Sequence, residues 1–154
     1  MPEPVIRHPG DEAAIVHPVG GEIAFKVRGE HTGGRLTALE TIAAPGEGPP
    51  MHTHASEDES LLILDGRFRF RLGDALEDAS EGAFVYIPRG VPHTWQNIGD
   101  RPARMFVFFT PSGMERFFDA FAASDAPGPE AFARAAGPAG MDVVGPPLGP
   151  GGPR

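Results

Sequence analysis

Three histidines and one glutamate in this sequence could bind a metal ion together. His52 and His54 lie two residues apart, Glu59 follows five residues later, and His93 lies in a second segment. Side chains two apart on a β-strand point to the same face, so His52 and His54 would face the same side. Imidazoles with a carboxylate, in a chain that has no cysteine, form the N/O ligand set that binds divalent first-row metals. The sequence therefore predicts one metal site with these four ligands.

A single His-x-His pair is a weak signal, because such pairs often lie on a surface or are hydrogen-bonded in a core. Here glycines and a proline surround the ligands at fixed offsets in two segments, residues 46–66 and 82–97. The positions are Gly46, His52, His54, Glu59 and Gly66 in the first segment, and Gly82, Pro88, Gly90, His93 and Asn97 in the second. With these spacings both segments match the two cupin motifs at every position, and the chain resembles the cupin superfamily.

The resemblance implies an all-β fold, a small antiparallel jelly-roll (cupin) barrel with one metal inside and one or two C-terminal helices. A degenerate barrel without metal is the alternative. The PSGMERFFDAF stretch and the VVGPPL stretch near the C-terminus resemble a narrower group, the single-domain quercetin 2,3-dioxygenase-like cupins. In such proteins the N-terminal arm often packs on a partner subunit.

The composition indicates one domain with many turns. The chain has 154 residues, among them 21 glycines and 18 prolines, which fits many short strands around a single core. A net charge of −8 repels a phosphate backbone and argues against a nucleic-acid partner. No apolar run has membrane-spanning length and the N-terminus lacks the apolar segment of a signal peptide, so we expect no membrane partner and a cytoplasmic location.

The elements that position the ligands follow from alternating apolar residues. We divide the one domain into an arm with a first strand (residues 1–34), a barrel core (35–110), and a C-terminal helix with a Gly/Pro-rich tail (111–154). Period-2 patterns predict strands at residues 22–28, 36–43, 59–64, 67–72, 83–87 and 103–110. Residues 73–81, GDALEDASE, are expected to be an acidic loop.

The strand after the His-x-His pair is apolar on both faces. If Glu59 points into the barrel, Leu61 and Ile63 point inward as well, which leaves Leu62 and Leu64 on an outer face. An apolar outer face needs a cover. A second barrel or the C-terminal helix would supply it, and we expect a homodimer.

Two helices are expected after the barrel. Ser112 and Glu115 have the spacing of a capping box. The apolar residues behind them, Met114, Phe117, Phe118 and Phe121, recur at helical spacing, and this amphipathic helix should lie against the barrel. A further short helix should begin at Pro129.

The ligand set favours catalysis, because three imidazoles and a carboxylate leave one or two coordination positions open. The ion would be Fe, Mn, Ni, Co, Cu or Zn. We expect a substrate pocket lined by Met51, Leu61, Ile63, Phe68, Phe70 and Trp95. His8, His17 and His31 fit no ligand pattern.

Taken with the resemblance, the site favours a quercetinase-like dioxygenase acting on a small enol- or phenol-type substrate with dioxygen, in which Glu59 takes the enol proton. Two alternatives stay open. The same site could serve a non-oxidative isomerase, cyclase or lyase, or the protein could bind a small ligand without catalysis.

Overall fold

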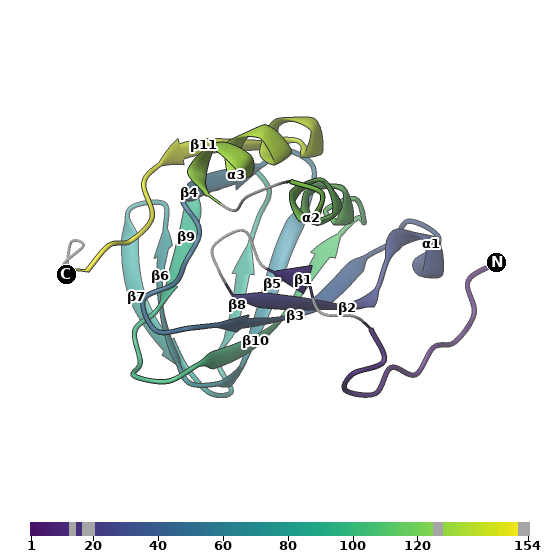
Figure 1. The fold of residues 1–154 in the computed structure, drawn as a ribbon, viewed down its shortest axis with the longest axis horizontal. Coiled ribbons are helices and arrows are strands. Elements are labelled where there is room, and N and C mark those ends of the chain that lie inside the picture. Colours follow the sequence, from purple (N-terminus) through teal and green to yellow (C-terminus); the bar gives the residue numbers. More distant parts are fainter. Residues whose placement is uncertain (13–14, 17–20, 125–127, 151–154) are drawn as a thin grey trace.

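Alternating apolar and polar side chains fold most of the chain into two antiparallel sheets (Figure 1). The structure, a computed structural model, describes residues 1–12, 15–16, 21–124 and 128–150. Its strands are β1 (Ile15–Val16), β2 (Glu22–Val27), β3 (Thr37–Ala43), β4 (Met51–His54), β5 (Asp58–Asp65), β6 (Arg67–Leu72), β7 (Ala75–Ser80), β8 (Phe84–Ile87), β9 (His93–Asn97), β10 (Ala103–Thr110) and β11 (Met141–Gly145).

The strand pairing is that of a jelly roll. One sheet has the order β1-β2-β3-β10-β5-β8 and the other has the order β11-β4-β9-β6-β7. The pairs β3 with β10, β4 with β9, β5 with β8 and β6 with β7 nest each hairpin inside the one before it. This confirms the predicted all-β fold class, with helices following the barrel at its C-terminal side.

The core lies between the two sheets and follows the predicted parity. Leu61 and Ile63 on β5 and Phe68 and Phe70 on β6 are at most 2% exposed, whereas Leu62 faces the other side and is half-buried. Burial of side chains of this size contributes about 1.5–3 kcal/mol each. The inward-facing half of each strand therefore stabilises the barrel that carries the ligands.

The prediction of an acidic loop at residues 73–81 is wrong, because β7 occupies most of it. The strand pairs along its whole length with β6 at the edge of the five-stranded sheet. Asp78 lies opposite Arg69 and accepts two hydrogen bonds from its guanidinium, at 2.7 and 3.0 Å. Most β7 side chains are exposed, so this edge strand lacks the period-2 apolar pattern by which strands are recognised in a sequence.

The helices gather at one end of the barrel, beside β4 and β11 (Figure 1). They are α2 (Glu115–Ala122), α3 (Pro129–Ala136) and the 3₁₀ turn η1 (Gly137–Ala139), while the short α1 (Gly29–Thr32) lies between β2 and β3. Helix α2 buries Phe117, Phe118 and Phe121, and α3 buries Phe132. The expected amphipathic helix packed on the barrel is therefore present.

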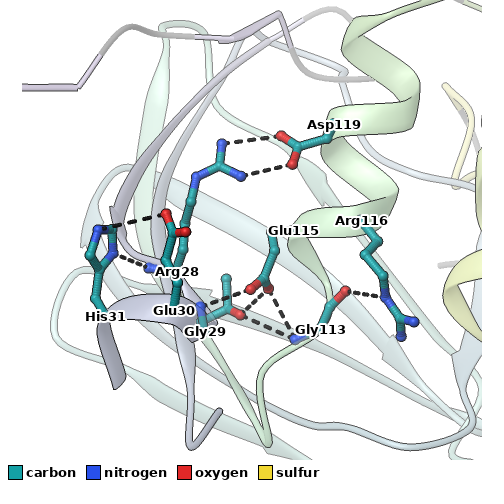
Figure 2. A network of polar contacts seen from close by, with 9 residues as sticks. Arg28, Gly29, Glu30, His31, Gly113, Glu115, Arg116 and Asp119 are labelled. Atoms are coloured by element: carbon teal, nitrogen blue, oxygen red, sulfur yellow. Dashed lines mark hydrogen bonds and ion pairs between the residues drawn. The ribbon is translucent and has the colours of Figure 1, made fainter. Parts of the chain in front are cut away.

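The predicted capping box at the start of α2 does not form. Met114 holds the N-cap position without a side-chain hydrogen bond. The carboxylate of Glu115 instead accepts hydrogen bonds from the backbone N–H groups of Gly29 at 2.8 Å and Gly113 at 3.0 Å, and from the hydroxyl of Thr37 (Figure 2). These bonds attach the start of α2 to α1 and β3, because tertiary donors compete successfully for the acceptor that a local cap would use.

The outer face of the six-stranded sheet is apolar at its β8 edge. Phe84 is 60% exposed and Tyr86 is 55% exposed, so no segment in the described part of the chain covers them. The C-terminal helices lie at the end of the barrel and do not supply the expected cover, and the homodimer stays a prediction. Among the described residues, no helix combines the length and the apolar composition needed to cross a membrane.

Candidate metal centre

Three strands bring the predicted ligands to one point inside the barrel. Strand β4 carries His52 and His54, β5 carries Glu59 and β9 carries His93. His52 and His93 lie directly opposite each other on the paired strands β4 and β9. All four side chains are buried, and one ligand atom from each lies within 4.8 Å of the others. The structure therefore places together the four residues that the sequence predicted as ligands.

Hydrogen bonds set the orientation of the imidazole rings. Nδ1 of His52 donates to the carbonyl of Pro50 at 2.7 Å, and Nδ1 of His93 donates to the carbonyl of Val91 at 2.8 Å. A carbonyl oxygen only accepts, so Nδ1 carries a proton in both rings. In both residues Nε2 is therefore the nitrogen left for a metal.

Glu59 lies at the centre of the cluster. Its Oε2 accepts a hydrogen bond from Nε2 of His93 at 2.8 Å and another from Nε2 of His54 at 3.1 Å. Burial acts to raise the pKa of Glu59, but these two hydrogen bonds and the charges of both imidazoles outweigh it and hold the pKa below its usual range. Glu59 is therefore a carboxylate at neutral pH.

The pKa values of His52 and His93 are shifted in opposite directions. Burial, together with the charges of His93 and His54, lowers the pKa of His52 to about 3, so this ring is a neutral base with a free lone pair. Burial also acts to lower the pKa of His93, but the hydrogen bond to Glu59 outweighs it and the pKa is raised. With Nδ1 donating to Val91 and Nε2 to Glu59, His93 carries both ring protons in this arrangement, and a metal held at Nε2 would replace the Nε2 proton.

The donor set fits one divalent transition-metal ion. Buried charges are tolerated when they are paired or coordinate a metal, and three imidazoles with one carboxylate suit several first-row ions without selecting one. An ion with these ligands keeps at least one position open, which is the arrangement of catalytic sites.

A small cavity adjoins the cluster. Its volume is about 40 Å³, and it is lined by the ligands His52, His54 and Glu59 and by apolar side chains of the barrel and the helices. The apolar lining residues that matter for access are Trp95, Phe109, Met114, Phe117 and Phe132. The Phe132 ring lies 6.1 Å from the His52 ring and 4.9 Å from the Phe117 ring, measured between centroids. Helices α2 and α3 therefore close the end of the barrel over the cluster.

Only one of the predicted pocket residues lines this cavity. Trp95 does, while Leu61, Ile63, Phe68 and Phe70 belong to the core and are not among the lining residues. Met51 lies in a separate groove beside Gly145 and Pro146. It precedes His52 on β4, and alternation along the strand points it to the opposite face.

Two groups of residues at this site are not predicted by the sequence. The first is the helical lining, Met114, Phe117 and Phe132; helical spacing marked the apolar face of α2, but nothing in the sequence placed it over the ligands. The second is Glu57, which is buried next to β5 and has an Oε2 atom without a hydrogen-bond partner. A second glutamate two residues before the ligand Glu59 was the available signal.

The other histidines lie away from the cluster. Nδ1 of His31 accepts a hydrogen bond from the backbone N–H of Arg28 at 3.0 Å, and His8 is exposed in the N-terminal arm. His17 lies outside the described residues.

Comparisons with known proteins agree with this architecture. The family described as the cupin domain matches residues 39–109. An uncharacterized protein of Methanocaldococcus jannaschii is 29% identical over 75 residues, which are 49% of this chain and 60% of that protein. Quercetin 2,3-dioxygenase of Bacillus subtilis (strain 168) is 28% identical over 68 residues, which are 44% of this chain and 20% of that protein. The chain thus spans less than two thirds of the length of these curated relatives.

Two solved structures share the fold. An RmlC-like cupin from Shewanella frigidimarina superposes with a TM-score of 0.63 at 12% identity, covering 73% of this chain and 96% of that chain. The polyketide cyclase RemF from Streptomyces resistomycificus also superposes with a TM-score of 0.63, at 20% identity, covering 71% of this chain and 81% of that chain. At these identities the likeness shows the fold alone.

Proposed function

Because this chain belongs to the cupin superfamily, we propose that it is a metal-dependent enzyme that oxidises a small enol- or phenol-type substrate with dioxygen. The observation that carries the proposal is the buried cluster of His52, His54, Glu59 and His93, whose ligand atoms lie within 4.8 Å of one another. The partial alignment with a quercetin 2,3-dioxygenase supports the oxidative reaction over the alternatives. The cytoplasmic location inferred from the sequence remains part of this proposal.

The four residues would hold a divalent transition metal through the Nε2 atoms of the histidines and a carboxylate oxygen of Glu59. Such an ion acts as a Lewis acid and as a template for an oxygen-containing substrate. The protein fixes two of the rings through the carbonyls of Pro50 and Val91, which reduces the reorganisation needed when the site is used.

Glu59 is the residue placed to accept a substrate proton. It lines the cavity beside the cluster, where a substrate hydroxyl could come within hydrogen-bond reach of its carboxylate. While both imidazoles donate to it, its pKa is held low and it is a weak base. Burial acts to raise the pKa, so Glu59 becomes a stronger base when it leaves one of those hydrogen bonds.

The small volume of the cavity limits what reaches the cluster. A cavity of about 40 Å³ has room for a water molecule or dioxygen, whereas organic ligands occupy pockets of roughly 300–1,000 Å³. An aromatic substrate therefore requires Phe117 and Phe132 to move away from the cluster. The apolar lining then excludes water, which strengthens electrostatic interactions with the substrate.

A non-oxidative isomerase, cyclase or lyase is the second candidate, and a specific contact favours it. Glu59 and His93 form a buried hydrogen-bonded pair in which the pKa of the carboxyl is lowered and that of the imidazole is raised. Such a pair can take and return a proton without an oxidant. Dioxygen dependence separates this candidate from the first.

The test combines metal content with turnover. Untagged protein from metal-replete growth is analysed for bound elements, and it is then incubated with a panel of enols and phenols that includes quercetin, with and without dioxygen. We expect about one transition metal per chain and substrate loss that matches dioxygen consumption. A His93→Ala variant is the control and should lose both.

Each other outcome contradicts the oxidative proposal. Substrate loss at equal rates without dioxygen would establish the isomerase, cyclase or lyase. Metal binding without turnover of any panel member, combined with saturable binding of one of them, would establish the binding-only alternative. Absence of metal in the wild-type protein would overturn both enzymatic candidates.

A further inference from the structure

The three imidazoles of the cluster differ in what holds Nδ1. In His52 and His93 this nitrogen donates to a backbone carbonyl two residues earlier in the chain. In His54 it is buried and has no hydrogen-bond partner in the described part of the protein. A buried polar atom without a partner costs about 1–3 kcal/mol, so this exception requires an explanation.

The other buried side-chain atom without a partner among the described residues is Oε2 of Glu57. Glu57 is 2% exposed and lies in the turn between β4, which carries His54, and β5, which carries Glu59. The charges of Glu57 and His54 are close enough to interact. One atom is a nitrogen that can donate and the other is a carboxylate oxygen that can accept, so each would satisfy the other.

The two atoms do not form a hydrogen bond in this arrangement, and the proton position on His54 gives no reason for them to do so. Nε2 of His54 donates to Glu59, so the proton of a neutral ring lies on Nε2 and Nδ1 has none to donate. When a metal occupies Nε2, the proton of the neutral ring must lie on Nδ1. Nδ1 then needs an acceptor, and Oε2 of Glu57 is the buried carboxylate oxygen without a partner in the described part of the chain.

The Glu57 carboxyl lies beside the start of α2, where the charge of Arg116 also acts on it. The backbone of Gly113 lies against it, since a Cβ atom added at Gly113 would come within 3.2 Å of Glu57 Oε1. Glu57 does not line the cavity of the cluster, so it would act on His54 and not on a substrate.

We propose that Glu57 is a positioning residue which accepts a hydrogen bond from Nδ1 of His54 when a metal is bound at Nε2. The inference rests on the metal site proposed above. A carboxylate in this position fixes the ring and increases the basicity of the ligand nitrogen, and loss of such a partner typically weakens metal binding by about 10- to 100-fold.

The test uses Zn²⁺, which is diamagnetic, with the Glu57→Met variant, which removes the acceptor, and the Glu57→Gln variant, which keeps an amide oxygen. Two quantities are measured on the full chain: the Kd for Zn²⁺ by competition with a chromophoric chelator, and the ¹⁵N and proton signals of the His54 ring. Glu77→Gln, at an exposed position of β7, is the control for the loss of one charge.

In the wild-type protein we expect a slowly exchanging Nδ1–H signal for Zn²⁺-bound His54. In Glu57→Met we expect the Kd to rise by about 10- to 100-fold and the Nδ1–H signal to shift or exchange rapidly, while the signals of His52 and His93 stay unchanged. Glu57→Gln should recover part of the affinity, and Glu77→Gln should bind Zn²⁺ like the wild type.

Several results would overturn the proposal. An unchanged Kd and an unchanged His54 signal in Glu57→Met would show that another group accepts the proton. Equal weakening in Glu57→Met and Glu57→Gln, with all three rings disturbed, would show a purely structural role. If Glu57→Met does not fold, Glu57→Gln is the variant that tests the proposal. A Kd for Zn²⁺ and a His54 signal equal to those of the wild type would then contradict a role for the carboxylate. Failure of the wild type to bind Zn²⁺ would overturn this inference and the metal site together.

Discussion

Replacing Glu115 by glutamine should lower the free energy of unfolding by more than the loss of a surface ion pair on α2 does. One carboxylate oxygen of Glu115 accepts from the N–H of Gly29, and the other accepts from the N–H of Gly113 and the hydroxyl of Thr37 (Figure 2). In the glutamine variant an NH₂ group replaces one of these two oxygens. The groups that donated to that oxygen then face another hydrogen-bond donor and lose their acceptor.

The magnitude follows from those contacts. A hydrogen bond to a charged group contributes about 1.5–3 kcal/mol, and a buried donor left without an acceptor costs about 1–3 kcal/mol. Glu115 is half-buried, so water partly replaces the lost acceptor. We expect the free energy of unfolding to fall by about 2 kcal/mol, which lowers the Tm by roughly 4–8 °C for a chain of this size.

The pH dependence gives a second, independent prediction. Burial acts to raise the pKa of Glu115, but the hydrogen bonds from Thr37 and from the backbone N–H groups outweigh it and the folded pKa is lowered. A carboxyl whose folded pKa lies below its unfolded value of about 4.3 stabilises the fold above that value and loses this effect as the pH falls through the folded pKa. The difference in stability between wild type and variant should therefore shrink below about pH 4.

Urea denaturation of the full chain at pH 7 and at several lower pH values measures both effects. Asp119→Asn is the matched control, because it removes the same charge from the same helix. Asp119 pairs with Arg28 at 2.8 and 3.1 Å but is half exposed, and such pairs contribute at most about 1 kcal/mol. Equal losses in the two variants, or a Glu115→Gln effect that is the same at pH 3 and pH 7, would refute the reasoning.

Three further predictions concern the metal, the closed cavity and the exposed face. His93→Ala should reduce the metal content from about one ion per chain to near zero while the circular dichroism spectrum stays that of a β protein; full retention of metal would contradict the ligand set. Phe132→Ala should lower the free energy of unfolding by about 3–5 kcal/mol, measured by urea denaturation; a loss below about 1 kcal/mol would mean that the ring does not pack tightly over the cluster. Phe84→Glu at the edge of the outer face should convert the predicted homodimer into a monomer in sedimentation velocity, with Glu77→Gln as an unaffected control; a monomeric wild type would contradict the dimer.

Which side chains of β4 and β5 face inward could be predicted from the sequence by parity, whereas the place of His93 among the ligands was implied by the cupin resemblance. His52 and His54 share a face of β4, and Glu59 shares a face with Leu61 and Ile63 on β5, so one assumption about the inside of the barrel fixed them all. The structure places each of these side chains on that inner side. Alternation along one strand predicts which of its side chains share a face, and this prediction needs no knowledge of long-range contacts.

Strand β7 and the covering helices could not be predicted in the same way. The residues of β7 are mostly exposed, and their pairing with β6 depends on backbone hydrogen bonds and on the Arg69–Asp78 contact. The apolar face of α2 was visible from its spacing, but its position over the cluster depends on Glu115 reaching Gly29 and Thr37. The pairing of β7 with β6 is local, through Gly73 and Asp74, but the exposed side chains of β7 lack the apolar alternation that marks a strand. The position of α2 is decided by residues distant in the sequence, which periodicity does not report.

The two glutamates near the start of β5 show that alternation predicts the direction of a side chain only within the strand itself. Glu57 and Glu59 are two residues apart, so a strand containing both would point both into the barrel. Strand β5 begins at Asp58, and Glu57 is therefore released from the alternation. Oε2 of Glu59 accepts two imidazole N–H groups, whereas Oε2 of Glu57 accepts none. A difference of one residue in the start of a strand thus separates Glu59, which belongs to the buried cluster, from Glu57, which we propose as a positioning residue for His54.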